Sequence, residues 1–239
     1  MNVQLFIPCF VDQLYPQTAF NMVKVLEKAG CSVHYNEQQT CCGQPAFNAG
    51  FRPEAKEVCS KFIKDFSGSD YIVAPSASCV GFVRNYYPAL FDNSSVHNDV
   101  KALQTRTFEL SEFLVKVLGV DDFGASFPAL ATYHDSCAGL RECRIKKEPR
   151  QLLSKVRGLE LVEMNDVETC CGFGGTFAVK FNAISAGMAD QKLNNALQTK
   201  AEYIISTDLS CLMHLQGYAN QQGMQIKTVH LADVLANGW

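Results

Sequence analysis

The sequence predicts an α/β fold of two pseudo-repeated, Rossmann-like βαβ modules with parallel sheets. Two observations predict it. Short apolar segments alternate with longer segments whose apolar residues recur at helical spacing, and this order occurs twice, each time with the same pattern of cysteines. Because parallel sheets bind ligands beyond the carboxyl ends of their strands, we expect the cysteine loops to lie at those ends.

The first module begins with an apolar segment, Val3–Pro8, that we expect to form a strand ending at Cys9. An amphipathic helix is predicted at Thr18–Ala29, because apolar residues recur there near a 3.6-residue period and Gly30 stands at the C-terminal cap position. The other elements expected in this module are a strand at Ser32–Tyr35, a helix at Glu54–Phe66 and a strand at Tyr71–Ala74.

The second module repeats this order. Its expected elements are strands at Leu130–Tyr133, Leu159–Val162 and Tyr203–Ser206, and helices at Arg144–Val156 and Ile184–Thr199. A helix is predicted between the modules at Val100–Val120, and Ile226–Val234 is expected to form a last strand or helix. We therefore predict two modules, residues 1–120 with a trailing helix and residues 121–239.

Local identities support a duplication. Thr40-Cys41-Cys42-Gly43 in the first module matches Thr169-Cys170-Cys171-Gly172 in the second, and Ser78-Cys79 matches Ser210-Cys211. Three pairs of cysteines that begin, centre and close the modules are separated by similar intervals of 128, 129 and 132 residues. Chance placement of cysteines does not produce such agreement, whereas an internal repeat does.

Composition excludes several classes of function. The chain is 47% hydrophobic and 19% charged, a balance typical of a globular protein, and its net charge of −3 does not favour nucleic-acid binding. No apolar stretch approaches the roughly 20 residues of a membrane-spanning helix, and the N-terminus carries no recognisable signal peptide. We therefore expect a cytoplasmic protein without an integral membrane segment.

Cysteine is the most informative residue type. There are 11 cysteines, an odd number and a high one for a cytoplasmic chain, which favours metal or redox chemistry over a disulfide framework. Four thiolates satisfy one tetrahedral zinc ion or one [4Fe–4S] cluster. The predicted metal ligands are therefore the eight repeated cysteines, namely Cys9, Cys41, Cys42, Cys79, Cys137, Cys170, Cys171 and Cys211.

One further ligand is predicted in the second module. His214 follows Cys211 at the spacing of a C-x-x-C second ligand, whereas its counterpart in the first module, Phe82, cannot bind a metal. Glycine after each cysteine pair, Gly43 and Gly172, permits unusual φ values, so that both adjacent sulfurs can face one site.

Other interpretations of these residues remain open. Buried free cysteines often act as small hydrophobic residues, and we expect this of Cys31, Cys59 and Cys143, which have no counterpart in the other module. The paired cysteines are also compatible with a thiol–disulfide relay. His134, which precedes Cys137, is either a structural residue or one that orients a thiolate or transfers a proton. A basic cluster follows Cys137 and comprises Arg141, Arg144, Lys146, Lys147 and Arg150. It is either a solvated surface, a docking patch, or a group of charges that stabilises an anionic cluster or a carboxylate substrate.

Four segments of the chain resemble the CCG-type cysteine-rich domain family. They are Ile7-Pro8-Cys9, Thr40–Pro45, Cys170–Phe177 and Ser210–His214. That family includes heterodisulfide reductase B subunits, the iron–sulfur subunit of glycolate oxidase and the A-type proteins of bacterial lactate utilization, and the segments look most like the last group. The resemblance covers nearly the whole chain.

The resemblance implies a cofactor for each module. Family repeats with five cysteines bind non-cubane [4Fe–4S] clusters, and some other repeats bind zinc. Here Phe82 and His214 replace the fifth cysteine. The first module could therefore hold zinc, a second and simpler cluster, or nothing. In the second module we expect a [4Fe–4S] cluster, of the cubane or the non-cubane type, held by Cys137, Cys170, Cys171, Cys211 and His214.

The resemblance also implies a function. It predicts an iron–sulfur electron-transfer subunit that works with a ferredoxin-like iron–sulfur subunit and a further lactate-utilization subunit to oxidise L-lactate, a 2-hydroxy acid, to pyruvate. Two alternatives remain: a subunit of the heterodisulfide or thiol reductase type, and a non-catalytic binding module stabilised by zinc.

Overall fold

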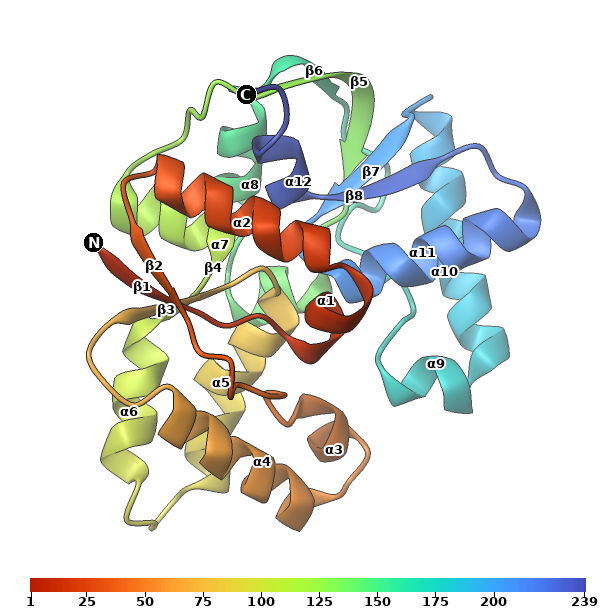
Figure 1. Cartoon of the computed structure of the whole chain (residues 1–239). Coiled ribbons are helices and arrows are strands. Elements are labelled where there is room, and N and C mark those ends of the chain that lie inside the picture. Colours follow the sequence, from red (N-terminus) through yellow and green to blue (C-terminus); the bar gives the residue numbers. More distant parts are fainter.

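A computed structural model describes residues 1–239 and contains two four-stranded sheets, both entirely parallel (Figure 1). The first has the order β2-β1-β3-β4 and the second the order β6-β5-β7-β8, so the two repeats share one topology and the predicted fold class is confirmed. The strands are β1 (Asn2–Leu5), β2 (Ser32–Tyr35), β3 (Tyr71–Ala74), β4 (Thr107–Glu109), β5 (Ser126–Tyr133), β6 (Arg157–Leu161), β7 (Tyr203–Ser206) and β8 (Lys227–His230).

Helices connect the strands, as parallel pairing requires. In the first repeat they are α1 (Cys9–Leu14), α2 (Pro16–Lys28), α3 (Gln44–Asn48), α4 (Arg52–Asp65), α5 (Ala77–Leu90), α6 (His97–Arg106), α7 (Leu110–Glu112) and the π-helical segment η1 (Phe113–Leu118). In the second they are the π-helical segment η2 (Ala138–Glu142), α8 (Lys147–Leu153), α9 (Thr176–Lys180), α10 (Asn182–Gln198), α11 (Leu209–Gln222) and α12 (Leu231–Leu235). No helix combines the length and the apolar character that crossing a membrane requires.

The prediction of one helix at Val100–Val120 is wrong. Helix α6 ends at Arg106, and Thr107–Glu109 forms β4, which pairs with β3 and completes the first sheet. Burial explains the difference, because Thr107 and Glu109 are fully buried at the sheet edge and the chain must be extended to bond to Ile72 and Ala74. The segment Ile226–Val234 contains both of its expected alternatives, first β8 and then α12.

The two repeats share a hydrophobic core. One cluster of 36 buried residues includes Leu5 of β1, Leu26 of α2, Ile204 of β7 and Val234 of α12. Helices α2 and α12 lie side by side (Figure 1), and Thr18 Oγ1 donates a hydrogen bond to Asp233 Oδ2 at 2.9 Å. The predicted division between residues 120 and 121 separates the two sheets and stays a prediction.

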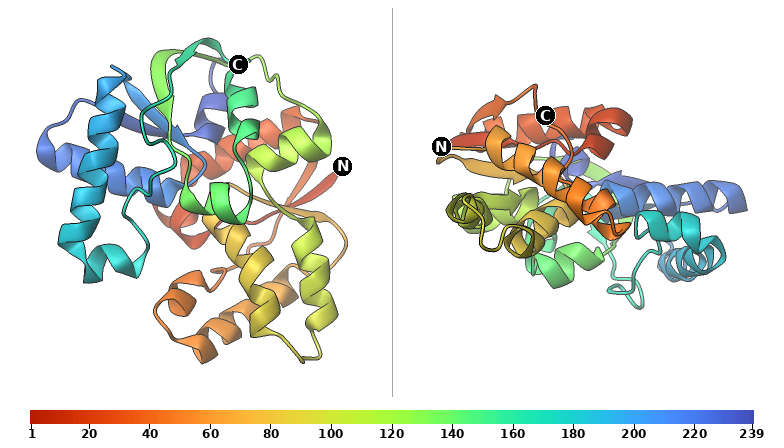
Figure 2. Two further views of the ribbon diagram at one scale, coloured as in Figure 1. Left: turned by 180° about the vertical axis from the view of Figure 1, so that it is seen from behind. Right: turned by 90° about the horizontal axis from the view of Figure 1, so that it is seen from below.

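A second core of 18 buried residues belongs almost wholly to the first repeat and is rich in aromatic rings. Phe6, which directly follows β1, packs edge-on against Phe62 and Phe66 of the α4 region, with ring centroids 4.8 and 5.6 Å apart. Figure 2 shows that α4 and α6 of the first repeat lie apart from α9 and α10 of the second. The cysteine loops lie at the carboxyl ends of the strands.

Candidate metal centres

The four predicted cysteines of the first repeat come from three loops at the carboxyl end of its sheet. Cys9 begins α1 after β1, Cys41 and Cys42 lie between β2 and α3, and Cys79 lies in the first turn of α5 after β3. The order of the sheet reverses between β1 and β3, and such a switch point is where α/β sheets bind ligands.

These four sulfurs form a chain of contacts. Cys42 Sγ lies 3.4 Å from Cys79 Sγ, and the thiols of Cys9 and Cys42 both bond to the sulfur of Cys41. The hydrogen bonds from Cys42 and Cys9, together with one from the backbone N–H of Gly43 at 3.3 Å, lower the pKa of Cys41 to about 3. The first repeat therefore presents one thiolate surrounded by three further thiols, which is a donor set for a thiophilic metal.

The second repeat has the same chain of contacts among its predicted cysteines. The thiols of Cys137 and Cys171 bond to Cys170 and hold its pKa far below its usual range, while Cys171 also bonds to Cys211. The backbone N–H of Gly172 donates to Cys170 Sγ at 3.4 Å. Each repeat thus brings its four predicted cysteines together.

The glycine after each cysteine pair is required by the backbone. Gly43 and Gly172 have φ values of +92° and +94°, a region that other residues rarely adopt. A Cβ atom at Gly43 would lie 2.9 Å from Cys59 Sγ, and one at Gly172 would lie 2.6 Å from the carbonyl oxygen of Ser185. A side chain at either position would therefore clash, and each glycine donates its own N–H to the sulfur of the first cysteine of the pair.

Side chains from neighbouring helices fix the two cysteine loops. The buried hydroxyl of Tyr87 on α5 donates a 2.6 Å hydrogen bond to the carbonyl of Cys42. In the second repeat the hydroxyl of Ser185 on α10 donates to the carbonyl of Gly172 at 2.8 Å. These bonds hold the adjacent sulfurs in position without any metal.

His214 lies beside the second loop. Its Nε2 is 3.2 Å from Ser185 Oγ, and its ring centroid is 6.0 Å from that of Phe173. Burial lowers the pKa of His214, so that the ring is neutral at neutral pH. Its role as a ligand stays a prediction. Phe82, at the matching place, is buried among aromatic rings of the first repeat.

A second histidine, His134, is closer to the thiols than the sequence indicated. Its ligand nitrogen and the sulfurs of Cys171 and Cys211 all lie within 4.8 Å of one another. Its side chain is fully buried, and neither ring nitrogen has a hydrogen-bond partner. Burial, aided by the nearby positive charge of Lys192, lowers the pKa of His134 to about 3, so the ring is neutral. A buried polar group without a partner costs about 1–3 kcal/mol, which a bound metal would offset.

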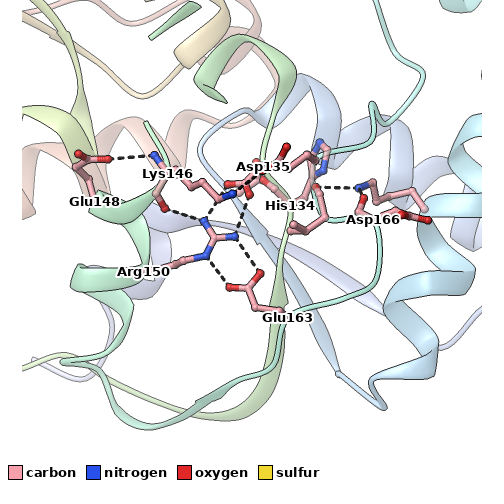
Figure 3. Close-up of polar contacts among 11 residues, drawn as sticks. His134, Asp135, Lys146, Glu148, Arg150, Glu163 and Asp166 are labelled. Atoms are coloured by element: carbon pink, nitrogen blue, oxygen red, sulfur yellow. Dashed lines mark hydrogen bonds and ion pairs between the residues drawn. The ribbon is translucent and has the colours of Figure 1, made fainter. Parts of the chain in front are cut away.

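The residues after His134 form an ion-pair network (Figure 3). Arg150 bonds to both carboxylate oxygens of Asp135 at 2.9 Å and to both of Glu163 at 2.6 and 2.9 Å. Lys146 pairs with Glu168 on the surface. Two members of the basic cluster are therefore paired, and Arg150 anchors the strand end that carries His134.

The three unrepeated cysteines are buried, as expected, and lie outside both sets of contacting sulfurs. Cys59 donates to the carbonyl of Cys42 and Cys143 to that of Ala77, each at 3.4 Å. Cys31 packs in the shared core. Their contacts are those of small buried side chains.

Both donor sets suit a thiophilic metal or an iron–sulfur cluster. Each offers four sulfurs at the end of a parallel sheet with backbone N–H groups aimed at sulfur, and the second also holds the unpartnered imidazole of His134.

Comparison with known proteins identifies the repeat. Residues 3–84 and 131–216 each match the family described as CCG, cysteine-rich domain. The chain is 42% identical over 235 residues to lactate utilization protein A of Geobacillus thermodenitrificans, covering 98% of both chains. It is 45% identical over 240 residues to lactate utilization protein A of an Exiguobacterium species, covering 99% of this chain and 98% of the relative.

A solved structure shows the same fold. The crystal structure of a hypothetical protein from Helicobacter pylori matches 98% of this chain and 48% of its own length, with a TM-score of 0.61 and 12% identity. At that identity the likeness concerns the fold alone.

Proposed function

Because this chain belongs to the CCG cysteine-rich domain family, with full-length relatives named lactate utilization protein A, we propose that it is the iron–sulfur electron-transfer subunit of a multi-protein complex that oxidises L-lactate. The observation that carries the proposal is the pair of four-thiol sets at the carboxyl ends of two equivalent sheets. Each set of four sulfurs suits one metal ion or one iron–sulfur cluster.

The thiolates of Cys137, Cys170, Cys171 and Cys211 would hold a [4Fe–4S] cluster of the second repeat, with His214 predicted beside them. Such a cluster, when bound, accepts and releases one electron at a time. Hydrogen bonds to sulfur set the potential of a cluster, and the N–H of Gly172 supplies one such bond.

The first repeat would hold zinc or a second cluster through Cys9, Cys41, Cys42 and Cys79. Its fifth position is Phe82, and Phe6 occupies the place that His134 takes in the second repeat. Four sulfurs with no imidazole nearby favour a structural zinc ion in this repeat.

Electron transfer requires partners. We propose a ferredoxin-like iron–sulfur subunit and a further lactate-utilization subunit, acting in the cytoplasm. Electrons from lactate oxidation would pass through the centre of the second repeat.

Metal analysis tests this function. The full chain, purified without oxygen, is assayed for iron, zinc and acid-labile sulfide, and the same sample is examined by EPR. We expect about four iron and four sulfide per chain with a redox-active signal. Zinc without sulfide would contradict electron transfer and favour a zinc-stabilised binding module.

Growth tests the physiological part. A deletion strain should fail to grow on L-lactate and recover with the intact gene but not with a Cys171→Ser variant. Normal growth of the deletion strain would remove lactate from the proposal. Disulfide reduction by the reconstituted complex, without lactate oxidation, would assign it to the thiol reductase class.

A further inference from the structure

His134 and Phe6 occupy the same position in the two repeats. Each directly follows the central strand of its sheet, and each makes the same backbone bond: Phe6 N–H donates to the carbonyl of Val73 at 3.0 Å, and His134 N–H to that of Ile205 at 2.8 Å. The two positions are therefore structurally equivalent. The first repeat carries a benzene ring where the second carries an imidazole.

The neighbour of this side chain differs in the same way. Phe62 lies ten residues after the start of α4 and Lys192 ten residues after the start of α10. Phe62 packs against Phe6, whereas the buried Lys192 lies near His134. An apolar pair in the first repeat is thus a polar pair in the second.

Lys192 has partners of its own, but His134 has none. The Lys192 ammonium is buried and donates to the carbonyls of Asp166 and Val167, at 2.7 and 3.0 Å, in the segment that leads to Cys170. Both ring nitrogens of His134 lack any hydrogen bond. No hydrogen bond within the protein therefore accounts for a polar side chain at this position, where the first repeat carries phenylalanine.

The surroundings of the imidazole supply the reason. The ring is fully buried, and its ligand nitrogen lies within 4.8 Å of Cys171 Sγ and Cys211 Sγ, which themselves lie within that distance of each other. One metal atom bound by two thiolates and a nitrogen has ligand atoms this close together. An imidazole nitrogen that makes no hydrogen bond within the protein has a lone pair with which to bind a metal.

We propose that His134 is a nitrogen ligand of the metal centre in the second repeat, bound to the same metal atom as Cys171 or Cys211. The proposal rests on the proposed function in one respect, namely that the second repeat holds a metal. It gives this repeat a ligand that the cysteine pattern does not contain, and it makes the two centres chemically different.

A difference in ligand set is the direct consequence. Both repeats offer four sulfurs, and His134 adds to the second a neutral nitrogen ligand that Phe6 cannot supply in the first.

Isotope labelling tests the ligand without changing the fold. The full chain is produced with ¹⁵N-histidine and with natural histidine, loaded and reduced without oxygen, and examined by pulsed EPR. We expect a nitrogen coupling of the size that direct ligation produces, altered by the label. A weak coupling, typical of a nitrogen hydrogen-bonded to sulfur, or none in a sample with iron, sulfide and an EPR signal, would overturn the inference and leave the proposed function intact.

Matched variants assign the coupling. His134→Phe and His214→Phe each install the residue that the first repeat carries, at Phe6 and Phe82. We expect the coupling to disappear in His134→Phe and to persist in His214→Phe. The opposite result would assign the nitrogen to His214 and overturn the inference. Should His134→Phe fail to fold, His134→Asn is the second variant, judged by the same signal.

Failure of the proposed function would appear separately, as zinc without iron or sulfide. X-ray absorption at the zinc edge then tests the same ligand. One nitrogen in the zinc shell that is lost in His134→Asn supports the inference, and an all-sulfur shell overturns it.

Discussion

Asp208 of the second repeat accepts two hydrogen bonds from Ser78 of the first, from its backbone N–H at 2.9 Å and from its hydroxyl at 3.1 Å. Asp208 directly precedes α11, the helix that carries Cys211, and Ser78 directly precedes Cys79 in α5. Ser76 and Asp208 also form an isolated antiparallel bridge. The starts of the two cysteine-bearing helices are thus bonded to each other across the repeats.

Removing this carboxylate should loosen the contact. In Asp208→Ala the N–H and hydroxyl of Ser78 and the hydroxyl of Ser210 all lose the carboxylate that accepts their hydrogen bonds. We expect the free energy of unfolding to fall by about 1–3 kcal/mol, measured by urea denaturation of samples with equal metal content.

Asp92→Ala, at an exposed position, is the control and should change stability by less than about 0.5 kcal/mol. An equal effect of both variants would mean that the bond between Ser78 and Asp208 contributes nothing.

The loop glycines should be intolerant of a methyl group. Gly172→Ala places a Cβ 2.6 Å from the carbonyl of Ser185 at a positive φ, so the loop must move and carry Cys170 and Cys171 with it. We expect loss of the second metal centre with the first retained, measured as metal per chain and by the EPR signal.

Gly217→Ala is the matched control. Gly217 lies within α11 and nothing would contact its Cβ, so alanine should stabilise the helix by roughly 0.5–1 kcal/mol. Full metal content in Gly172→Ala would show that metal binding does not depend on the loop conformation that glycine permits.

Cysteine substitutions separate ligands from core residues. Cys171→Ser and Cys211→Ser remove thiolates from the contacting set and should abolish the metal and the activity of the second repeat together. Cys59→Ser keeps a donor for the carbonyl of Cys42 and should retain both. Metal analysis of the three variants decides, and equal loss in all three would mean that core residues have been taken for ligands.

The buried carboxyl group of Glu109 should make stability depend on pH. Burial raises the pKa of Glu109 to about 8, and its Oε2 accepts bonds from Ser111 N and Glu112 N. Between roughly pH 4.5 and 8 the folded protein keeps a proton that the unfolded chain has lost, so the free energy of unfolding falls as pH rises through this window.

Glu109→Gln removes this contribution and keeps an acceptor for both bonds. Urea denaturation at several pH values should give a flatter profile for Glu109→Gln than for the wild type, by up to about 1.4 kcal/mol per pH unit within the window. Parallel profiles would show that Glu109 does not hold the proton.

The sequence was sufficient for most of the strands, though not for β4, and for the convergence of the cysteines. Strands β2, β3 and β7 coincide with their predicted bounds, because short apolar runs between turn residues have few alternatives. The contact between Cys42 and Cys79 follows once three such strands are known to be parallel, because their carboxyl ends meet at one edge.

Other features depend on tertiary packing and left no local signal. Helix α5 was not predicted, because Val80, Gly81, Phe82 and Val83 are all buried and give no amphipathic period. The proposed role of His134 depends on its contact with Cys171 and Cys211, which are distant in sequence. The one signal available in the sequence was that His134 stands three residues before Cys137, as Phe6 stands three residues before Cys9.

The core that runs through both sheets has a consequence for how the two cysteine sites can differ. Neither half can separate from the other without exposing core residues such as Leu26 or Val234, so both sites depend on one scaffold. A side chain beside one site can therefore differ from its counterpart beside the other without loss of the common core. The first repeat carries Phe6 and Phe82 where the second carries His134 and His214, and these are two such differences.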